Sequence, residues 1–333
     1  MSQSSYHNAL LIVNPVAGQA RGERLGAQMK AALKKHGVVC TVRRTQGEGD
    51  AMRLSRSAAA DGFDLIVAIG GDGTLSEVVS GQARTDTKVP VAIVPAGTAN
   101  VVAIALALPW FPTLTVGSML ESSAVPFDVG FVPDLDRHFL LMAAIGYPAR
   151  VIQDSPRKLK NLYGIFTYAA AGIRNAFHLD EFWISVTDEN NQVHTFEGNT
   201  VLLSNIGHLG DLNLRVTPDT SAHDGRFDVA VISTRSLWEL TAVIFRMLTW
   251  RLFSGNRQAR RMEHMQAQKV VIETTPPVPV QIDGEVIGET PLAAEIVANG
   301  VHLIVGKRYR ADSSLVDFLA DLKITYLWRP KKD

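Results

Sequence analysis

The stretch that decides the fold is Asp64-Leu65-Ile66-Val67-Ala68-Ile69-Gly70-Gly71-Asp72-Gly73-Thr74. Its apolar run predicts a buried strand, and residues 75–79 predict the start of a helix. Glycines between a strand and a helix let backbone N–H groups turn toward an anion, and the helix points its positive N-terminus at the same place. The stretch therefore predicts a phosphate cradle, to which Asp72 adds a carboxylate where a nucleotide would bring Mg²⁺.

Outward from this stretch, short β-branched runs alternate with helical patterns over residues 9–126. The alternation predicts a doubly wound α/β fold, in which helices cover both faces of a parallel sheet. Ligands bind outside the carboxyl ends of the strands in such sheets. The expected strands are 10–14, 38–43, 65–70 and 91–95, and the expected helices are 21–36, 49–61, 75–82 and 99–107.

After residue 128 the sequence changes to strand patterns with hairpin turns and few helices. This pattern predicts a mainly antiparallel, β-sandwich-like domain. We therefore expect an α/β domain at 1–128, a β-rich domain at 129–306, and a final segment, 307–333, that packs back on the first domain. The expected strands are 182–187, 200–205, 226–233, 269–273, 278–282 and 301–305, the expected turns are 188–191 and 283–284, and the expected helices are 158–177 and 236–253.

The composition is that of a globular protein, and 333 residues are enough for two domains with a core each. Lys and Arg together equal Asp and Glu at 33 each, which argues against a broad basic face for nucleic acid. Cys40 is the single cysteine, so no intramolecular disulfide can form; we expect it to pack in a strand and the protein to occupy a reducing compartment.

Targeting and membrane signals are absent from the sequence pattern. The polar residues 1–8 and the short apolar run 9–13 do not predict a signal peptide. The longest apolar run, 101–108, is shorter than the roughly 20 residues that a membrane span needs. We therefore expect a soluble cytoplasmic protein.

Two further loops lie between a predicted strand and a predicted helix. The first, Asn14-Pro15-Val16-Ala17-Gly18 with Arg21 after it, is either a nucleotide contact or, as its local sequence favours, a turn that needs Pro and Gly for geometry alone. The third, Pro95-Ala96-Gly97-Thr98-Ala99-Asn100, can present Thr98 and Asn100 at the same strand edge. Together with the middle loop they predict one crevice. The chain has no GxxxxGK[ST] sequence, which excludes a P-loop enzyme.

Taken together, the three loops resemble the catalytic domain of the diacylglycerol kinase and sphingosine kinase superfamily, most closely its bacterial soluble lipid kinases. Phosphofructokinases and NAD kinases share the middle motif, but the lipid kinases combine all three. The resemblance implies that ATP binds to these loops and to Thr45, which precedes Gly47-Glu48-Gly49-Asp50. The implied ATP-binding residues are Asn14, Pro15, Gly18, Thr45, Gly70, Gly71, Asp72, Gly73, Thr74, Leu75, Ser76, Gly97, Thr98 and Asn100.

Two segments of the second half extend the resemblance. Ser221-Ala222-His223-Asp224-Gly225-Arg226-Phe227-Asp228 resembles the family's segment for a structural Mg²⁺, which implies Asp224 as ligand with Ser221 and Arg226 as flanking positions. The alternative is a turn that opens a strand.

The other segment, Gln281-Ile282-Asp283-Gly284-Glu285, resembles the one that holds the family's catalytic carboxylate, which maps to Glu285. Asp-Gly between β-branched runs is also a strong hairpin signal, and the local sequence favours that reading. Carboxylates at both Asp283 and Glu285 support the catalytic reading, because an alcohol nucleophile needs a general base within hydrogen-bond reach.

The chain also departs from the family pattern. Val101 stands where the family commonly has Asp, and Gly146-Tyr147-Pro148-Ala149 stands where it commonly has Gly-Phe-Asp-Ala. Both lost acids are candidates for contacts with the polar part of a lipid, so the acceptor is less determined than the nucleotide. The glycine cluster before the metal segment is reduced to Gly207 and Gly210.

Two remaining patterns concern membranes and metals. The Trp, Phe and Arg residues of 236–253 predict a helix packed on the second domain, with a helix at a membrane interface as the alternative. The nine histidines show no HExxH or paired Cys/His spacing, which argues against a catalytic zinc.

The resemblance, taken together with these patterns, implies a kinase that uses ATP and Mg²⁺ to phosphorylate a hydroxyl of a diacylglycerol-like or other long-chain lipid. Asp72, Asp283 and Glu285 are the expected catalytic residues, with Glu285 taking the alcohol proton. The expected partner is a lipid at the inner face of the membrane, bound peripherally; nucleic acid is not expected, and a homodimer is compatible with the sequence. The alternatives are a soluble kinase of NAD or sugar phosphates and a non-catalytic nucleotide- or lipid-binding regulator.

Overall fold

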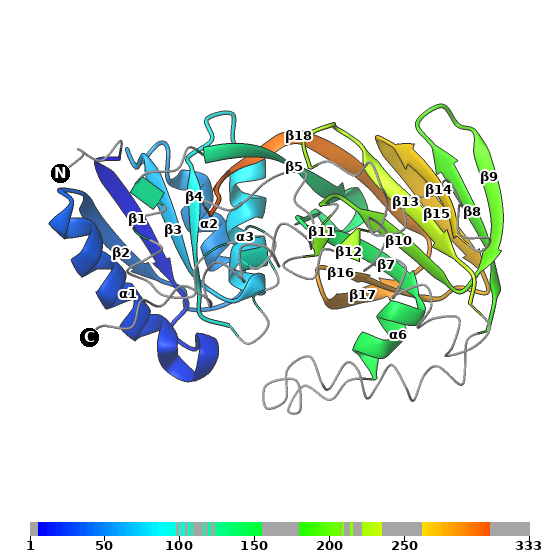
Figure 1. Cartoon of the computed structure of the whole chain (residues 1–333), viewed down its shortest axis with the longest axis horizontal. Helices are drawn as coiled ribbons and strands as arrows, with labels where there is room; N and C mark the ends of the chain where they lie inside the picture. The colour runs from blue at the N-terminus through cyan, green and yellow to red at the C-terminus, as the bar shows by residue number, and fades with distance from the viewer. Residues whose placement is uncertain are drawn as a thin grey trace, which may run out of the picture.

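The computed structural model describes residues 6–97, 100, 102–103, 106, 108, 116, 119–120, 124–154, 180–206, 208–209, 214–215, 222–234 and 262–306. Within these residues, an α/β region and a β-rich region lie side by side along the long axis of the molecule (Figure 1). The α/β region contains the predicted parallel sheet, and the β-rich region is mainly antiparallel. The predicted fold class is therefore confirmed.

Parallel strands alternate with helices in the α/β region. They are β1 (Asn8–Val13), α1 (Ala17–Lys35), β2 (Val39–Arg44), α2 (Asp50–Ser57), β3 (Leu65–Gly70), α3 (Asp72–Ala83) and β4 (Val91–Pro95). The strands are parallel, in the order β2-β1-β3-β4. All six residues of β3 are buried, as expected for an apolar run inside a sheet that is covered on both faces.

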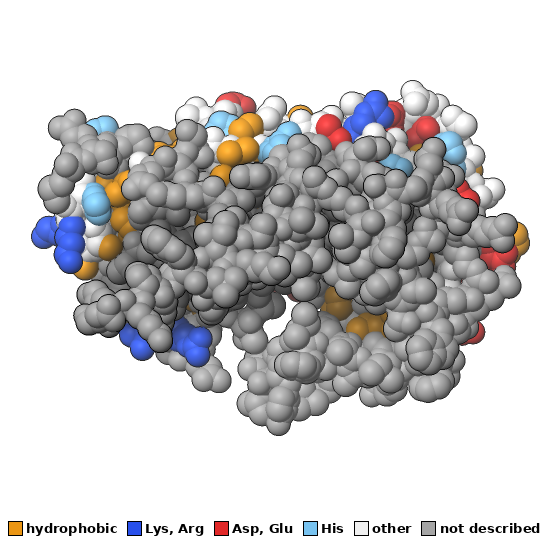
Figure 2. All heavy atoms as spheres, viewed as in Figure 1, with side chains coloured by type: hydrophobic (Ala, Val, Ile, Leu, Met, Phe, Trp, Pro, Cys, Tyr) orange, Lys and Arg blue, Asp and Glu red, His pale blue; other side chains and the backbone are white. Residues whose placement is uncertain are grey.

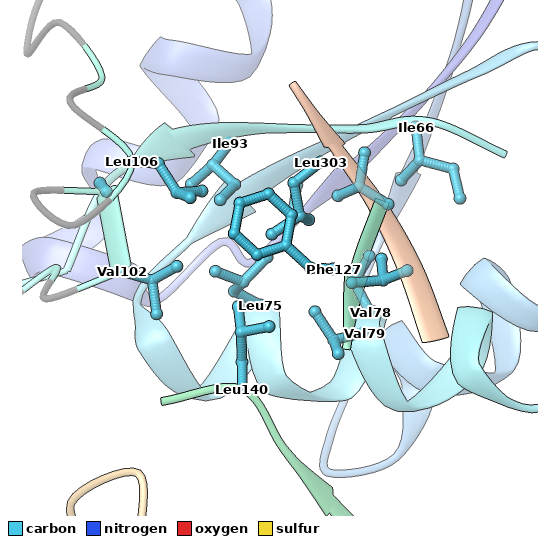
Figure 3. Close-up of a cluster of buried hydrophobic side chains, with 14 of the residues drawn as sticks. Ile66, Leu75, Val78, Val79, Ile93, Val102, Leu106, Phe127, Leu140 and Leu303 are labelled. Atoms are coloured by element: carbon cyan, nitrogen blue, oxygen red, sulfur yellow. The ribbon is translucent and has the colours of Figure 1, made fainter. Parts of the chain in front are cut away.

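Helices cover the two faces of this sheet. Helix α1 buries Met29 and Leu33 against one face. Helix α3 buries Leu75 and Val78 against the other face, where Figure 3 shows them close to Phe127. Burying apolar side chains of this size contributes about 1.5–3 kcal/mol each, so the sheet and the two helices stabilise one another.

Helix boundaries differ from the predicted ones by a few residues. Helix α1 begins four residues earlier than predicted, and α3 begins at Asp72, because the backbone is already helical directly after the extended residue Gly71. Helix α2 ends at Ser57 rather than residue 61, before a turn in which Gly62 has φ +77°. Of the helix predicted at 99–107, the structure describes Val102 and Ala103 as helical.

The sheet continues beyond β4 into the β-rich region. Six more strands of it are β5 (Ala124–Val132), β6 (Arg137–Phe139), β8 (Phe182–Asp188), β9 (Val193–Gly198), β15 (Lys269–Thr275) and β18 (Leu292–Ile304). Strand β18 is parallel to β4 at Leu303 and antiparallel to β15 at its other end. It also pairs with β5, with a register shift between Val297 and Val301. Strand β18 therefore crosses from one region to the other (Figure 1), and the expected boundary at residue 128 lies inside β5.

A second, antiparallel sheet faces the β8 and β15 end of the first one. In spatial order its strands are β14 (Met262–Ala267), β13 (Phe227–Ile232), β10 (Thr200–Ser204), β7 (Met142–Gly146), β16 (Pro279–Ile282) and β17 (Glu285–Glu289). A buried apolar core that draws on both sheets lies between them and contains Phe139 stacked on Phe227, with ring centroids 5.6 Å apart. The predicted sandwich-like packing is thus present. The short elements are η1 (Pro133–Leu135), β6 (Arg137–Phe139), α6 (Tyr147–Gln153), β11 (His208–Leu209) and β12 (Leu214–Arg215).

Most strand predictions in this region are confirmed, and the predicted turns join β8 to β9 and β16 to β17. The strand predicted at 301–305 is only the end of β18, which starts nine residues earlier and passes through Asn299 at φ +51°. Strands β5, β6, β7, β11, β12 and β14 were not predicted, and β9 and β17 were implied only by the turns that precede them. The predicted helices 158–177 and 236–253 and the final segment 307–333 lie outside the described residues.

The surface in view carries mixed charge. Along the upper edge of the face shown in Figure 2, Asp, Glu, Lys, Arg and His side chains are interspersed among the described residues. No helix in the described part of the chain is long and apolar enough to span a bilayer. Cys40 lies half-buried in β2 as a free thiol, and burial raises its pKa.

Candidate nucleotide-binding and catalytic site

The three glycine-bearing loops meet backbone to backbone. A Cβ atom added at Gly18 would lie 1.9 Å from the carbonyl oxygen of Ala96, so the first loop touches the third. A Cβ atom added at Gly97 would lie 2.7 Å from the Cα of Gly71, so the third loop touches the second. Glycine is required at these positions because the neighbouring backbone occupies the space of a side chain. The predicted convergence of the loops is therefore present in the fold.

Side-chain hydrogen bonds tie the first loop to the second. Asn14 donates from Nδ2 to the Thr74 hydroxyl at 3.1 Å, and its Oδ1 accepts from the N–H of Val16 at 3.1 Å. Thr74 in turn packs on Gly70, where an added Cβ would lie 2.4 Å from Oγ1. Asn14 and Thr74 thus fix the geometry of the loops and leave the backbone facing the crevice.

Helix α3 begins directly in the middle loop. Its N-cap residue, Gly71, provides no side-chain hydrogen bond to the first turn, and Gly73 within that turn is exposed. The uncapped N–H groups and the helix dipole form the kind of site that binds phosphate. Leu75 is buried in the core and Ser76 is half-buried, so any contact that Leu75 makes with a ligand must come from its backbone.

Asn100 shapes the third loop rather than presenting its side chain to the crevice. Its Oδ1 accepts the N–H of Gly97 at 2.9 Å, and its Nδ2 donates to the Gly97 carbonyl at 2.7 Å. The side chain is buried and the backbone has φ +48°, a left-handed conformation that Asn tolerates well. The expectation that Asn100 faces the strand edge is wrong, because its amide is used by the loop itself; Thr98 lies outside the described residues.

A cavity of about 310 Å³ opens beside the loops. Thr45 reaches it because its N–H continues the pairing of the sheet edge by donating to the carbonyl of Val13 at 2.9 Å. The cavity is lined by Asn14, Pro15, Val16, Thr45, Gln46, Gly47, Glu48, Ala51, Thr74 and Glu77.

Sequence reasoning placed Asn14, Pro15, Thr45 and Thr74 at this site but missed Gln46, Glu48, Ala51 and Glu77. Glu77 would have been found if the helix had been predicted to begin at residue 72, because positions 74 and 77 then lie on one face of it.

The middle loop lies close to a carboxylate of the β-rich region. Asp72 accepts the N–H of Val102 at 3.3 Å through Oδ1. Burial raises the pKa of Asp283, three backbone hydrogen bonds act in the opposite direction, and the negative charge of nearby Asp72 raises it further. The two predicted catalytic aspartates are therefore near enough to interact electrostatically, although they are more than 200 positions apart in the sequence.

Asp283 anchors the turn between β16 and β17. Its carboxylate accepts the N–H groups of Leu140, Leu141 and Met142 at 2.8, 2.9 and 3.1 Å. Leu140 and Leu141 belong to the same core as Leu75 of α3, and Figure 3 shows Leu140 beside Leu75. Leu140 and Leu141 thus pack near α3 and also bond to the Asp283 carboxylate. The Asp283 turn therefore lies near the glycine loop from which α3 begins. The hairpin reading of this segment is correct, and the carboxylates sit on that hairpin.

Glu285 begins β17 at the end of this turn. Its side chain is 61% exposed and forms an ion pair with Arg137, with 2.5 Å between Oε2 and Nη2. Arg137, on β6, was missed by sequence reasoning, because 148 residues separate the two partners and no local pattern links them. The pair holds an accessible carboxylate beside the anchored turn.

The predicted metal segment forms a turn before β13. Asp224 is exposed and accepts the N–H of Arg226 at 3.0 Å, while Gly225, at φ +70°, donates to buried Asp128 at 2.7 Å. Partial burial raises the pKa of Asp224, and the neighbouring charges of Asp228 and Asp128 raise it further.

The Arg226 guanidinium pairs with Glu189 at 3.8 Å, and Ser221 lies outside the described residues. Within the described part of the chain, no group of three or more His, Cys, Asp or Glu is arranged to hold a metal. The segment thus forms the turn before β13, and its role as a structural Mg²⁺ site stays a prediction.

One departure from the family pattern has a structural role. Pro148 occupies the first turn of α6, where a residue without an N–H is tolerated. The helix follows Gly146 at φ +82°, and Tyr147 donates its N–H to the Asn199 carbonyl at 3.0 Å. Val101 lies outside the described residues.

Comparison with known families covers most of the chain. Residues 8–132 match the sequence model of the diacylglycerol kinase catalytic domain. Residues 142–305 match that of the YegS C-terminal NAD kinase beta sandwich-like domain. The first stretch runs from β1 to the end of β5, and the second runs from β7 to the end of β18.

Individual proteins agree with this result. A diacylglycerol kinase of Bacillus subtilis (strain 168) is 27% identical over 302 residues, which cover 90% of this chain and 96% of that protein. A diacylglycerol kinase of Staphylococcus carnosus (strain TM300) is 27% identical over 291 residues, covering 85% of this chain and 90% of that protein.

Solved structures show the same architecture. A crystal structure of a Bacillus anthracis str. Sterne protein, provisionally designated a diacylglycerol kinase, superposes with a TM-score of 0.75 at 25% identity and covers 92% of this chain and 97% of that one. With both domain models matched in order and the three loops in place, the chain belongs to the diacylglycerol kinase superfamily of lipid kinases, phosphotransferases that use an alcohol group as acceptor.

Proposed function

We propose that this protein uses ATP and Mg²⁺ to phosphorylate a hydroxyl group of a diacylglycerol-like or other long-chain lipid. The observation that carries the proposal is that three glycine loops pack on one another, while the Asp283 turn is bonded to Leu140 and Leu141, which share a core with helix α3. A phosphate donor and an alcohol acceptor can meet where these two parts meet. The Bacillus subtilis and Staphylococcus carnosus relatives that are named diacylglycerol kinases support the lipid class.

ATP fits the loops for reasons of both shape and charge. Gly18, Gly71 and Gly97 leave backbone, rather than side chains, at the crevice, and the N-terminus of α3 offers N–H groups to phosphate oxygens. The adjoining cavity of about 310 Å³, lined in part by Thr45, extends the site away from the loops. We place the phosphates on the loops and the nucleoside in this cavity.

Mg²⁺ fits at Asp72. Kinase sites bind Mg²⁺ through one or two carboxylates together with the substrate phosphates, so a dedicated cage of protein ligands is not required. When bound there, the ion supplies neutralisation of the phosphate charge. A second, structural Mg²⁺ at the turn that bears the exposed Asp224 carboxylate stays a prediction.

Glu285 is the proposed general base. The hydroxyl oxygen of the acceptor attacks the γ-phosphorus, the bond to the β,γ-bridging oxygen breaks, ADP leaves, and the hydroxyl proton passes to the carboxylate. Asp283 is less suited to this step, because three N–H groups already bind its carboxylate. We assign Asp283 to holding the turn, and Glu285, which is exposed, to taking the proton.

A membrane-borne acceptor requires at least transient peripheral binding at the membrane surface. Soluble acceptors are the competing possibility, and the name of the matched C-terminal domain, which mentions NAD kinase, makes NAD a specific rival. The deciding experiment incubates the protein with γ-labelled ATP, Mg²⁺ and, separately, lipid extracts, NAD and sugar phosphates. We expect label in a lipid. Label in NAD or a sugar phosphate alone would refute the lipid assignment, and ATP binding without transfer to any acceptor would favour a regulator.

Substitution of Glu285 by Gln tests the base. It removes the proton acceptor but preserves the shape of an exposed side chain, so transfer should fall by about 10²–10⁴-fold while ATP binding stays unchanged. The measurement is turnover with the identified acceptor, alongside calorimetric titration with ATP. Undiminished turnover would remove Glu285 from this role.

A further inference from the structure

We propose that Glu77 binds the ribose hydroxyls of the nucleotide and makes the protein selective for ribonucleoside triphosphates over deoxyribonucleoside triphosphates. The proposal rests on the proposed function, since it takes the cavity beside the glycine loops as the nucleoside site. Its basis is the position of the Glu77 carboxylate on the cavity wall, together with the hydrogen bond that fixes it there.

The cavity wall is polar in a way that orients a nucleotide. Asn14 and Thr74, which are bonded to each other, lie on the wall beside the glycine loops. Glu48 and Glu77 lie on the same wall, and none of the described residues that line the cavity is Lys or Arg. Carboxylates repel phosphate groups, whereas the N–H groups of the loops attract them. The triphosphate therefore points toward the loops, and the sugar lies against the carboxylates.

Of the two carboxylates, Glu77 is the one held in place. Its Oε2 accepts the N–H of Ala51, in the first turn of α2, at 2.9 Å. Its Oε1 accepts no hydrogen bond from any described residue, whereas Glu48 is exposed. An ionised carboxylate can only accept hydrogen bonds, and the sugar hydroxyls can donate them. A fixed acceptor costs less conformational entropy on binding than a mobile one, which favours Glu77 over Glu48.

A purely structural role for Glu77 would be to join α2 to α3, but other contacts already join these helices. Ser55 donates its hydroxyl proton to the Val78 carbonyl at 2.7 Å, and Gln82 donates to the Ser55 carbonyl at 2.6 Å. At Gly81, an added Cβ would lie 2.4 Å from the carbonyl oxygen of Met52, so the two backbones are in direct contact. The helix pair therefore does not depend on Glu77.

The test measures the affinity of the full-length protein for ATP, 2′-deoxy-ATP and 3′-deoxy-ATP by calorimetry. The unmodified protein should bind at least one of the deoxy nucleotides about tenfold more weakly than ATP, as expected for the loss of a hydrogen bond to a charged group. Glu77→Gln should bind ATP about tenfold more weakly and should bind all three nucleotides with similar affinity. The control, Glu295→Gln, makes the same chemical change on β18, at an exposed ion pair with Lys269, and should preserve the discrimination.

Each contrary result has a distinct meaning. Equal binding of all three nucleotides by the unmodified protein would overturn the ribose assignment and leave the proposed function intact. Equal weakening of all three by Glu77→Gln, with the discrimination preserved, would assign Glu77 to structure alone and also overturn the proposal. Absence of binding to any of these nucleotides would overturn the proposed function together with the inference. The comparison of nucleotides on the unmodified protein remains decisive even if the variant does not fold.

Discussion

Replacing Gly97 by Ala tests the contact on which the nucleotide site depends. The added Cβ would lie 2.7 Å from the Cα of Gly71, so the two loop backbones must separate by about 0.7 Å to reach the 3.4 Å of ordinary contact. Overpacking of this kind costs about 1–3 kcal/mol in free energy of unfolding. Displacement of a positioning group by about 1 Å can cost on the order of 100-fold in rate.

The assay combines urea unfolding with kinase turnover over a range of ATP concentrations. We expect the free energy of unfolding to fall by about 1–3 kcal/mol and kcat/KM for ATP to fall by on the order of 100-fold. The matched control for stability is Gly73→Ala in the neighbouring loop, where an added Cβ has open space and the residue is helical. That change should increase stability by about 0.5–1 kcal/mol. If Gly97→Ala matched the unmodified protein in both measurements, the loops would not be in the tight contact described above.

Two further predictions concern the β-rich side of the site. Asp283→Asn turns an acceptor oxygen into a donor facing a backbone N–H, so we expect a loss of about 1–3 kcal/mol in urea unfolding and a reduced kcat; an unchanged unfolding curve would contradict the anchoring role. Burial lowers the pKa of His138 from 6.5 to about 4. The unfolded chain therefore takes up a proton at this residue at a higher pH than the folded protein does. As the pH falls from 6.5 toward 4, the free energy of unfolding should decrease by at most about 3 kcal/mol. His138→Phe can keep the ring contact with Phe131 but has no group that takes up a proton. Its free energy of unfolding, measured between pH 7 and 4, should therefore fall less with pH than that of the unmodified protein. The same dependence on pH in both proteins would refute the assignment.

The local part of the fold could be predicted from the sequence. A six-residue apolar run between a charged residue and a glycine loop has few alternatives to a buried strand, and β3 occupies the predicted residues 65–70. The glycine loops could be predicted for a similar reason. Glycines at the end of a strand indicate a backbone conformation or a close contact that a side chain would prevent. Contacts such as Gly97 against Gly71 then confirm that the loops meet.

The long-range part could not be predicted. The length of β18 depends on partners on both of its edges, β5 along one side and β4 and β15 at opposite ends, and no local pattern encodes such pairing. The ion pair of Glu285 and Arg137 depends in the same way on how β6 is placed against β17. Asn100 illustrates a different difficulty, because a short amide side chain can bond either to a ligand or to its own loop, and only the backbone conformation decides between them.

The crossing strand β18 has a mechanical consequence for an enzyme that must bring two substrates together. Because one continuous strand is hydrogen-bonded into both regions, any change in the angle between them has to bend that strand. The strand would bend most easily at the register shift between Val297 and Val301, because a bulge already bends it there. The Asp128 carboxylate holds this bulge by accepting the N–H of Asn299 at 2.8 Å. A rotation of one region against the other would therefore bend β18 at this segment, together with β5, which pairs with it on both sides of the shift.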